Sequence, residues 1–533
     1  MLELETDVLV VGGGLGGVAA ARAAADSGCR VVLTEQYAWL GGQLTSQAVP
    51  PDEHRWVEQF GVTRSYRALR DGIRDYYRRH YPLTERARAW TELNPGAGAV
   101  SRLCHEPRVA LAVLDTMLAP YRGSGRLQVL QPCVAVSAGT DADRVTSVTV
   151  QDLLTGQETV VTAAYVLDAT ETGDLLPLTG CEYVTGFESR AETGEPNAPE
   201  TSQPLNMQAV SVCFALDHVD GDHTIDKPAG YDAWRDYQPE FWGSPLFSWS
   251  APNPRTRQPE ARLLDPNPDD DPAAIQADLS KEGGDLNLWT FRRIAARRNF
   301  IDGCYPSDIT LVNWPQIDYF EGPVIDVPDA AHHLQRARDL SRSFLYWMQT
   351  DAPRPDGGAG YPGLRLRGDV TGGADGLAMA PYIRESRRIR AQRTVVEQDL
   401  SLAVRGSRGA VQYPDSVGVG MYRIDLHPST GGDHYIDIGA SPFQIPLGAL
   451  LPVRLGNLVA AGKNIGTTHI TNGCYRLHPV EWNIGEVAGL LAAFCLQTGR
   501  VPHQVGDGEH LSTFQDLLVS RGVELRWPEV RGY

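Results

Sequence analysis

The strand, glycine-rich turn and helix near the start of the chain constrain its fold more than any other feature. Residues 7–11 (Asp-Val-Leu-Val-Val) form an apolar run typical of a parallel strand buried on both faces. The run ends in Gly12-Gly13-Gly14-Leu15-Gly16-Gly17, and an Ala-rich helix is expected from Val18 to Ser27. Gly12, Gly14 and Gly17 fit the dinucleotide fingerprint, which needs a tight turn, close backbone approach to a pyrophosphate and close packing of helix on strand.

The residues after this helix complete a dinucleotide-binding pattern. Gly28 suits a helix C-cap, residues 30–33 predict a second strand, and Glu35 and Gln36 follow at its end. A carboxylate about twenty residues after the glycines accepts hydrogen bonds from a ribose diol. We therefore expect the following residues of this first motif to bind a dinucleotide: Gly12, Gly14, Leu15, Gly16, Gly17, Glu35 and Gln36.

A glycine pair decides between the two common dinucleotides. Gly41-Gly42-Gln43 follows shortly after the ribose acid, and glycines there let the backbone pass close to the pyrophosphate and ribityl chain of a flavin, which a plain NAD domain does not need. We therefore expect Gly41, Gly42 and Gln43 to contact FAD. Here the sequence resembles the two-dinucleotide-fold flavoproteins, in particular the broad FAD-dependent oxidoreductase family, which is similar to fumarate reductase flavoprotein subunits.

A series of short strands precedes the second motif. Residues 127–130, 134–136, 145–150 and 159–161 predict an antiparallel meander, and the resemblance implies that the backbone at Val134 meets the adenine. Residues 165–170 then return to the parallel sheet. Ala169, Thr170 and Gly173 are similar to the family's Ala-Thr-Gly-Asp element, with Glu171-Thr172 as an insertion, and are expected to bind FAD.

The third motif lies near the C-terminus. Residues 458–461 predict a buried strand ending in Gly462-Lys463-Asn464-Ile465-Gly466, and ligands in such sheets sit beyond the carboxyl ends of the strands. A long helix is expected from about Val480 to Gln497, with Pro479 in its first turn. Its positive N-terminal end, aimed at flavin N1 and the C2 carbonyl, would stabilise the reduced flavin anion. The expected FAD contacts are Gly462, Lys463, Asn464, Ile465, Asn472, His478, Pro479 and Val480.

These motifs predict an α/β fold with a Rossmann-like FAD-binding domain of the glutathione-reductase type. Residues 1–180 and 441–533 would form this domain, and residues 181–440 an inserted, mixed α+β substrate domain. The middle has no second glycine-rich fingerprint, so no separate NAD(P)H domain is expected. The Asp-rich loop at 266–272 is interpreted as solvated, and no metal site is expected, because its prolines prevent a compact ligand cage.

Charge and cysteine usage limit the partners. A net charge of -18 disfavours nucleic acid and anionic membranes, which are polyanions. The eight cysteines are scattered without a C-x-x-C pair, which favours buried reduced thiols. With no apolar stretch of membrane-spanning length and no visible export signal, we expect a cytoplasmic enzyme acting on a small molecule. The sequence leaves open whether it is a monomer or a homo-oligomer.

Three side chains are the candidates for chemistry. Oxidation by a flavin usually needs a base for the neighbouring O–H or N–H proton. His469 is our choice for this acid/base, His54 is a second candidate, and Arg384 is expected to orient the substrate. His469 opens a His-x-x-Asn-Gly-x-x-Arg-Leu pattern that resembles the segment closing on the flavin ring in fumarate reductase relatives. Arg384 lies in residues 381–389, which resemble a signature of the FAD-dependent oxidoreductase family.

The expected reaction is removal of a hydride from a C–OH, C–N or C–C bond by a dehydrogenase or oxidase. A flavin monooxygenase is an alternative, although such enzymes usually have a Gly-Asp pair where this chain has Gly462-Lys463. A lyase or hydratase that retains FAD for structure also stays open.

Overall fold

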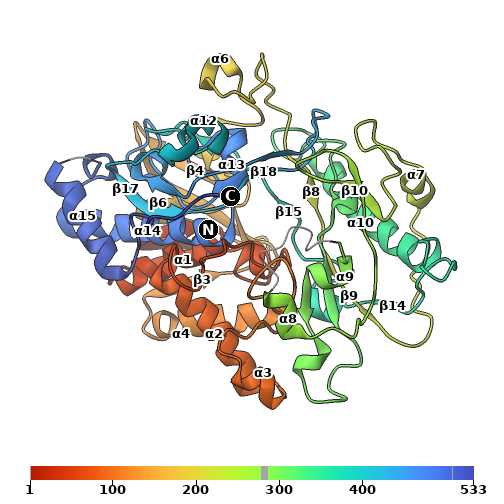
Figure 1. The fold of residues 1–533 in the computed structure, drawn as a ribbon. Helices are drawn as coiled ribbons and strands as arrows, with labels where there is room; N and C mark the ends of the chain where they lie inside the picture. Colours follow the sequence, from red (N-terminus) through yellow and green to blue (C-terminus); the bar gives the residue numbers. More distant parts are fainter. Residues whose placement is uncertain (1, 278–285, 507) are drawn as a thin grey trace.

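A seven-stranded sheet organises the part of the molecule that carries all three motifs (Figure 1). The computed structural model describes residues 2–277, 286–506 and 508–533. The strands run in the order β3-β2-β1-β6-β5-β4, and β21 also pairs with β6. Their bounds are β1 (Leu2–Val11), β2 (Val31–Thr34), β3 (Leu127–Leu130), β4 (Cys133–Asp141), β5 (Arg144–Asp152), β6 (Glu158–Asp168) and β21 (Leu458–Ala460).

Five of these strands are parallel, and their carboxyl ends lie at one edge. Val11 of β1 pairs with Thr34 of β2 on one side and with Asp168 of β6 on the other. Asp168 in turn pairs with Ala460 of β21, and β3 pairs in parallel with β2. The turns that follow β1, β6 and β21 therefore leave the sheet side by side.

The antiparallel meander is confirmed for β4, β5 and β6, but residues 127–130, expected as its first strand, form β3 and pair in parallel with β2. A second difference concerns the last strand of the meander. β4, β5 and β6 pair antiparallel in sequence order. Residues 159–161 and 165–170 were expected as two separate strands, but β6 is continuous from Glu158 to Asp168. It pairs with β5 over its first half and with β21 over its last three residues. The change of partner explains why a single strand has two distinct patterns along its length.

Two helices close the packing under the first motif. α1 (Leu15–Asp26) contacts α14 (His478–Thr498), and Pro479 lies in the first turn of α14 as expected. A methyl group on Gly485 would lie 1.9 Å from the carbonyl oxygen of Gly16, and one on Gly489 would lie 2.2 Å from that of Ala20. Glycine therefore permits a backbone-to-backbone contact between helices from opposite ends of the chain.

A second hydrophobic cluster lies in the middle of the sequence. An antiparallel sheet of order β12-β13-β9-β14 contributes buried residues to both clusters, and the long helix α10 belongs to the second (Figure 1). The bounds are β9 (Phe214–His218), β12 (Arg293–Ala295), β13 (Ile309–Val312), β14 (Leu364–Leu366) and α10 (Ala330–Thr350). The first cluster also includes Val417, Ile424 and Leu426, which fall within the expected substrate domain at 181–440. The clusters therefore do not divide the chain at the expected boundaries, which stay a prediction.

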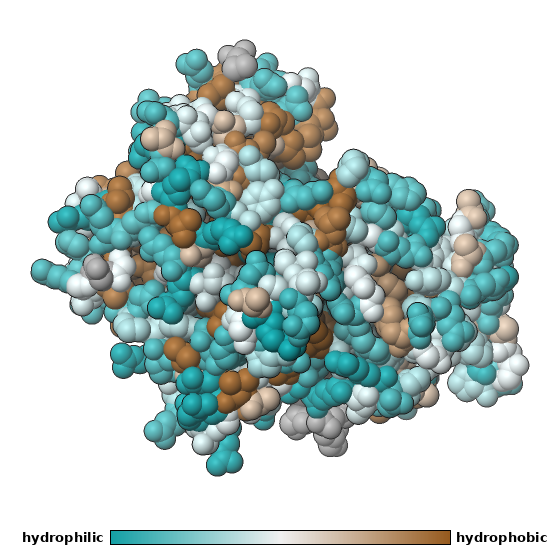
Figure 2. Space-filling view, turned by 90° about the horizontal axis from the view of Figure 1, so that it is seen from above, coloured by the Kyte–Doolittle hydropathy of each residue, from teal (hydrophilic) through white to brown (hydrophobic). Residues whose placement is uncertain are grey.

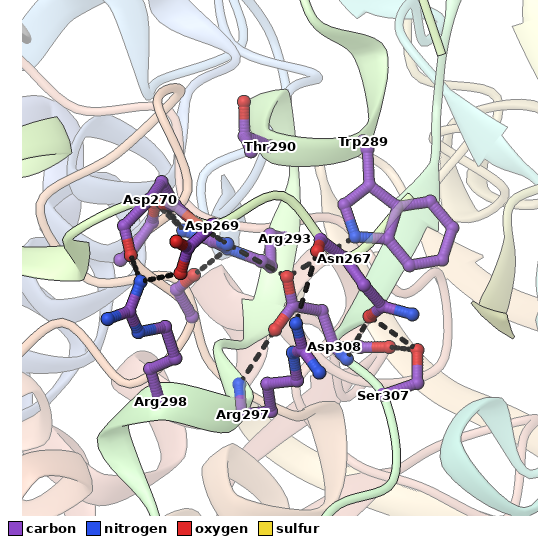
Figure 3. A network of polar contacts seen from close by, with 12 residues as sticks. Asn267, Asp269, Asp270, Trp289, Thr290, Arg293, Arg297, Arg298, Ser307 and Asp308 are labelled. Atoms are coloured by element: carbon purple, nitrogen blue, oxygen red, sulfur yellow. Dashed lines mark hydrogen bonds and ion pairs between the residues drawn. The ribbon is translucent and has the colours of Figure 1, made fainter. Parts of the chain in front are cut away.

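The Asp-rich loop is not simply solvated, because Asp269 and Asp270 form ion pairs with Arg298 and Arg293 (Figure 3). Asp270 pairs with the buried Arg293 at 2.6 Å and its side chain is only 18% exposed. Asp269 pairs with Arg298 but is 96% exposed. Asp271 pairs with Arg86 at 2.8 Å. The three carboxylates thus pair with three different arginines. The described residues contain no group of three or more His, Cys, Asp or Glu side chains arranged to hold a metal.

The remaining surface features are unremarkable for function. Within the described ranges, no helix has the length and apolar composition needed to cross a membrane. Figure 2 shows a face on which hydrophilic residues predominate and hydrophobic ones form separate groups. No two cysteines are bonded in the described parts of the chain, and Cys304 is exposed while the other seven are buried.

The glycine contact between α1 and α14 generates a stability prediction. Gly485→Ala places its methyl group against Gly16 and should destabilise the protein by about 1–3 kcal/mol. Gly123→Ala is the matched control, because a methyl group there meets nothing within 4 Å, and it should be neutral or slightly stabilising. Thermal unfolding of the two variants checks this, and an equal Tm for Gly485→Ala and wild type would contradict the packing.

Candidate functional site

A cavity of about 230 Å³ opens where the carboxyl ends of β1, β2 and β6 meet. It brings together residues that lie more than 150 positions apart. The residues predicted from sequence that line it are Gly12, Gly14, Glu35, Gln36, Val134, Ala169 and Thr170. Glu171, Thr172 and Asp174 line it as well, and Gly173 forms the turn between them with φ +67°. The first and second motifs therefore meet at one concave site, whereas the predicted residues at 15–17, at 41–43 and in the C-terminal motif do not line it.

The glycine-rich turn is shaped by close backbone contacts. Gly12 has φ +98°, and a methyl group there would lie 2.3 Å from the carbonyl oxygen of Ala169. Gly14 precedes α1 without a side-chain cap. The N–H groups of the first turn, from Leu15 to Gly17, therefore point out of the helix end, where an anionic group is favoured.

Glu35 lies at the cavity as predicted, and its carboxylate also accepts hydrogen bonds from the backbone of the glycine-rich turn and of the residues after β2. It accepts hydrogen bonds from the backbone N–H groups of Gly13 at 2.9 Å and Tyr37 at 2.8 Å. Burial raises the pKa of Glu35 to about 7 despite these bonds. The ribose contact of this residue stays a prediction.

The glycine pair after β2 lies against the fingerprint. The Gly41 N–H donates to the Gly13 carbonyl at 2.8 Å, and Gly41 and Gly42 have φ of +106° and +48°. The following Gln43 is fully buried, and its amide nitrogen donates to the Arg476 carbonyl at 3.0 Å. Gln43 thus connects this pair to the C-terminal motif.

The C-terminal motif reaches the same place through the pairing of β21 with β6. The Ala461 N–H and the Asn464 side-chain amide donate to the Asp168 carbonyl at 2.8 and 3.0 Å. Lys463 is buried, pairs with Glu171 and donates to the Ile383 carbonyl at 2.6 Å. Gly462 to Ile465 therefore lie beside the second motif.

The N-terminal end of α14 presents a neutral histidine. The Asp52 N–H donates to His478 Nδ1 at 3.0 Å, so the ring proton is on Nε2. Burial lowers the pKa of His478 to about 3. Pro479 and Val480 complete the first turn, and Asn472 in α13 (His469–Tyr475) accepts from Gln208 at 3.2 Å.

These residues fit a bound dinucleotide. Their glycines permit close backbone approach, because a methyl group on Gly12 would collide with the Ala169 backbone, and methyl groups on Gly14 and Gly42 would lie 3.1 and 3.2 Å from Glu171 Oε1. Among the residues expected to bind FAD, three buried polar atoms have no hydrogen-bond partner within the described parts of the chain, namely Gln43 Oε1, Asn464 Oδ1 and His478 Nε2. Buried polar atoms are rarely left unpaired, so an additional polar group is expected to meet them.

His469, the predicted acid/base, is part of a buried charge network. Its Nδ1 lies 3.0 Å from Glu385, and its backbone N–H donates to Glu188 at 2.9 Å. Phe187 stacks on its ring with centroids 4.2 Å apart. Arg388 pairs with both carboxylates. The imidazole is therefore held rigidly by a carboxylate, a common arrangement for proton transfer.

Arg384 is held by protein groups. It pairs with Asp318 at 3.0 Å, donates to the Ala209 carbonyl at 2.7 Å and lies over the ring of Tyr382. Only its Nε lacks a partner within the described residues. This side chain is therefore more restrained than the free orienting cation that we expected.

His54 is separate from the other candidates. Its Nε2 lies 3.2 Å from the Gly61 carbonyl, and its ring packs edge-on against Trp527. Burial lowers the pKa of His54 to about 4. The ring of His54 thus contacts Gly61, Trp56 and Trp527. His54 does not line the cavity, and neither do His469 and Arg384.

Sequence reasoning missed a closed ring of polar contacts behind the signature segment. Tyr382 accepts a hydrogen bond from Arg476, and Arg476 pairs with Asp425. His427 lies between Asp425 and Asp318 and contacts both. Asp318 pairs with Arg384, whose guanidinium lies over the Tyr382 ring and closes the path. The distances along this path are 2.7, 3.5, 3.7, 2.6 and 3.0 Å. No motif signals Asp318, Asp425 or His427, because they lie in segments without a recognisable pattern.

The fold and the site define a dinucleotide-binding flavoenzyme. The family described as FAD dependent oxidoreductase matches residues 7–518. The chain belongs to this family, and its cofactor is FAD. A search of curated proteins found no match.

Similar solved structures are distant. An L-proline dehydrogenase from P. horikoshii shows 14% identity and a TM-score of 0.19, covering 35% of this chain and 24% of that one. OxyS anhydrotetracycline hydroxylase from Streptomyces rimosus shows 14% identity and a TM-score of 0.25, covering 41% and 39%. A geranylgeranyl bacteriochlorophyll reductase-like protein from Thermoplasma acidophilum shows 11% identity and a TM-score of 0.33, covering 98% and 85%. This chain thus spans less than half the length of the first two.

The burial of His54 generates a pH prediction. Its folded-state pKa is lowered to about 4, so the unfolded chain binds a proton that the folded chain does not as the pH falls below about 6.5. Stability is therefore lost towards acid pH. His54→Asn should lose about 2 kcal/mol less than wild type between pH 7 and pH 5, measured by urea unfolding. An equal loss in both proteins would show that His54 is accessible to protons in the folded state.

Proposed function

We propose that this chain is a flavin-dependent dehydrogenase or oxidase that takes a hydride from a C–OH, C–N or C–C bond of a small polar organic molecule. The observation that supports this most is the Glu385–His469 pair beside the cofactor cavity. A second, small cavity lined by Gln208 and Glu385 shares Val324 and Ile383 with the main one. His469 itself lines neither cavity, so its proposed place near FAD is supported through its partner Glu385.

The residues around the cavity would bind FAD, and FAD would accept the electrons. When bound, FAD supplies the acceptor for the hydride. Gly12, Gly14, Gly42 and the Gly462–Ile465 segment would hold it, and the N-terminal end of α14 would favour negative charge on the reduced ring. Strand order and meander support assignment of this part to the glutathione-reductase type, with residues 181–440 as the substrate domain.

His469 would take the proton that leaves the substrate. Burial alone would raise the pKa of Glu385, but the charges of His469 and Arg388 outweigh this effect and lower the pKa to about 2. This carboxylate therefore stays ionised. An ionised carboxylate at Nδ1 keeps a proton on that atom and leaves Nε2 to accept one. Glu385 is therefore a positioning residue and His469 the proposed acid/base.

The polar ring behind Tyr382 supports a polar substrate rich in acceptor oxygens. Buried N–H groups without a partner within the described residues are present at Arg292, Arg384 and Arg476. Arg384 and Arg476 are each paired with an aspartate, so the ring carries little excess charge. Carbonyl or hydroxyl oxygens of a substrate would satisfy these donors without adding a charge. Arg384 would then orient the substrate through this ring.

Anaerobic addition of substrate classes to the purified holoenzyme tests the reaction. Sugars, amines and hydroxy acids are the first classes to screen, with flavin absorbance as the readout. Bleaching is expected for a redox enzyme. A chain that converts its substrate while the flavin stays oxidised throughout would instead be a lyase or hydratase with structural FAD.

Replacement of His469 tests the base. With a reducing substrate, His469→Ala should lower the rate of flavin reduction by about 10²- to 10⁴-fold because proton transfer is lost. FAD should remain bound. His332→Ala, on the exposed face of α10, is the matched control and should react at the wild-type rate. An unchanged rate in a FAD-loaded His469→Ala enzyme would exclude His469 as the base.

Replacement of Glu385 tests its positioning role. Glu385→Gln removes the charge that favours a protonated imidazole, so the acid limb of the pH–rate profile for flavin reduction should move to lower pH. A purely structural role would lower the rate or the stability equally at every pH. A profile of unchanged shape would therefore contradict the proposed pair.

A further inference from the structure

Two carboxylates occupy the anion-binding end of α1. A methyl group built on Gly14 would lie 3.1 Å from Glu171 Oε1, and one on Gly42 would lie 3.2 Å from the same atom. The Gly16 N–H points to Glu481 Oε1 at 3.4 Å. Glu171 therefore lies between the two glycine motifs, at the place where the fingerprint binds a phosphate.

Within the described residues, a single lysine compensates this pair of charges. Lys463 pairs with Glu171, and both Lys463 and Glu481 are at most 3% exposed. Burial and the charge of Glu171 raise the pKa of Glu481 to about 7. The titratable groups that face the two carboxylates are Glu35 and Tyr37 after β2, Lys463 after β21, and the carboxylates themselves on either side.

Polar groups without partners point to a ligand at the same place. Gln43 is 0% exposed and bonds Glu481 through its amide nitrogen, but its Oε1 lacks a partner within the described residues. Asn464 Oδ1, next to Lys463, also has none there. An N-terminal helix end favours one anionic group, and a diphosphate in contact with two ionised carboxylates would be repelled strongly in this buried setting.

We propose that Glu171 is a built-in anion in the phosphate cradle, and that the diphosphate of FAD replaces its carboxylate there and takes over its ion pair with Lys463. The inference rests on the proposed placement of FAD in this cavity and is independent of the reaction. Glu171 then competes with the cofactor, and its negative charge weakens the retention of FAD. Lys463 strengthens the retention of FAD, because it forms an ion pair with the diphosphate once the carboxylate of Glu171 has been displaced.

Release of FAD from the full-length holoenzyme tests this without any substrate. The enzyme is diluted, and the recovery of free FAD fluorescence gives the dissociation constant and the release rate. Glu171→Gln keeps the shape of the side chain and removes its charge, so it should bind FAD about tenfold more tightly, which corresponds to about 1.4 kcal/mol. Glu200→Gln, an 82% exposed surface carboxylate, is the matched control and should behave as wild type.

A pH series and two further variants sharpen the test. Wild-type release should accelerate from pH 6 to pH 8 as the carboxyl pair gains charge, and the dependence should be weaker in Glu481→Gln. Lys463→Gln should release FAD faster than wild type at every pH. If Glu171→Gln folds poorly by circular dichroism, Glu171→Ser supplies the same charge change.

Clear results would overturn the proposal. FAD affinity in Glu171→Gln and Glu171→Ser equal to or weaker than wild type would show that Glu171 does not compete with the cofactor. An FAD release rate in Lys463→Gln equal to that of wild type would show that Lys463 does not pair with the diphosphate. A chain in which no substrate bleaches the flavin would overturn the proposed reaction and leave these binding results unaffected.

Discussion

The position of β6 between β1 and β21 is the constraint on which the site depends. Because Asp168 pairs with Val11 on one side and with Ala460 on the other, three turns from distant parts of the sequence leave the sheet at one edge. The close contact of α1 with α14 then fixes the helix ends at that edge. The three motifs that are expected to bind FAD come together only when residues near both ends of the chain meet.

Buried charge is the second organising principle. The carboxylates and cations around the site are arranged in pairs, such as Glu385 with Arg388 and Asp318 with Arg384. A buried ion that loses its partner is strongly destabilising, so these pairs fix side-chain positions. Glu171, Glu481 and Lys463 differ, because two carboxylates share a single cation. This imbalance lies at the cofactor site, where an anionic ligand changes the electrostatics most.

The signature segment 381–389 connects the two hydrophobic clusters with the candidate chemistry. Tyr382 belongs to the first cluster and Ile383 to the second. Arg384 reaches the polar ring through Asp318, while the next residue, Glu385, holds His469. Consecutive residues of a short extended segment point in opposite directions, so one segment can serve two polar networks. Arg384, Glu385 and Arg388 are accordingly buried, whereas Arg387 is only partly buried and pairs with Asp174 and Asp326.

Local pattern determined the elements of this protein, and tertiary contact decided the surroundings of its polar side chains. The sequence alone determined the strand–turn–helix at residues 7–26, the meander, α10 and α14, because hydrophobic periodicity, glycine and proline act over neighbouring residues. It also indicated some of the residues that line the cavity, namely Gly12, Gly14, Glu35, Gln36, Val134, Ala169 and Thr170. Only the fold revealed that His54 lies against Trp527, that Arg384 is restrained by Asp318, and that Glu171 and Glu481 share Lys463. These contacts join positions separated by dozens to hundreds of residues, and burial, which sets their charges, is a property of the whole packed chain.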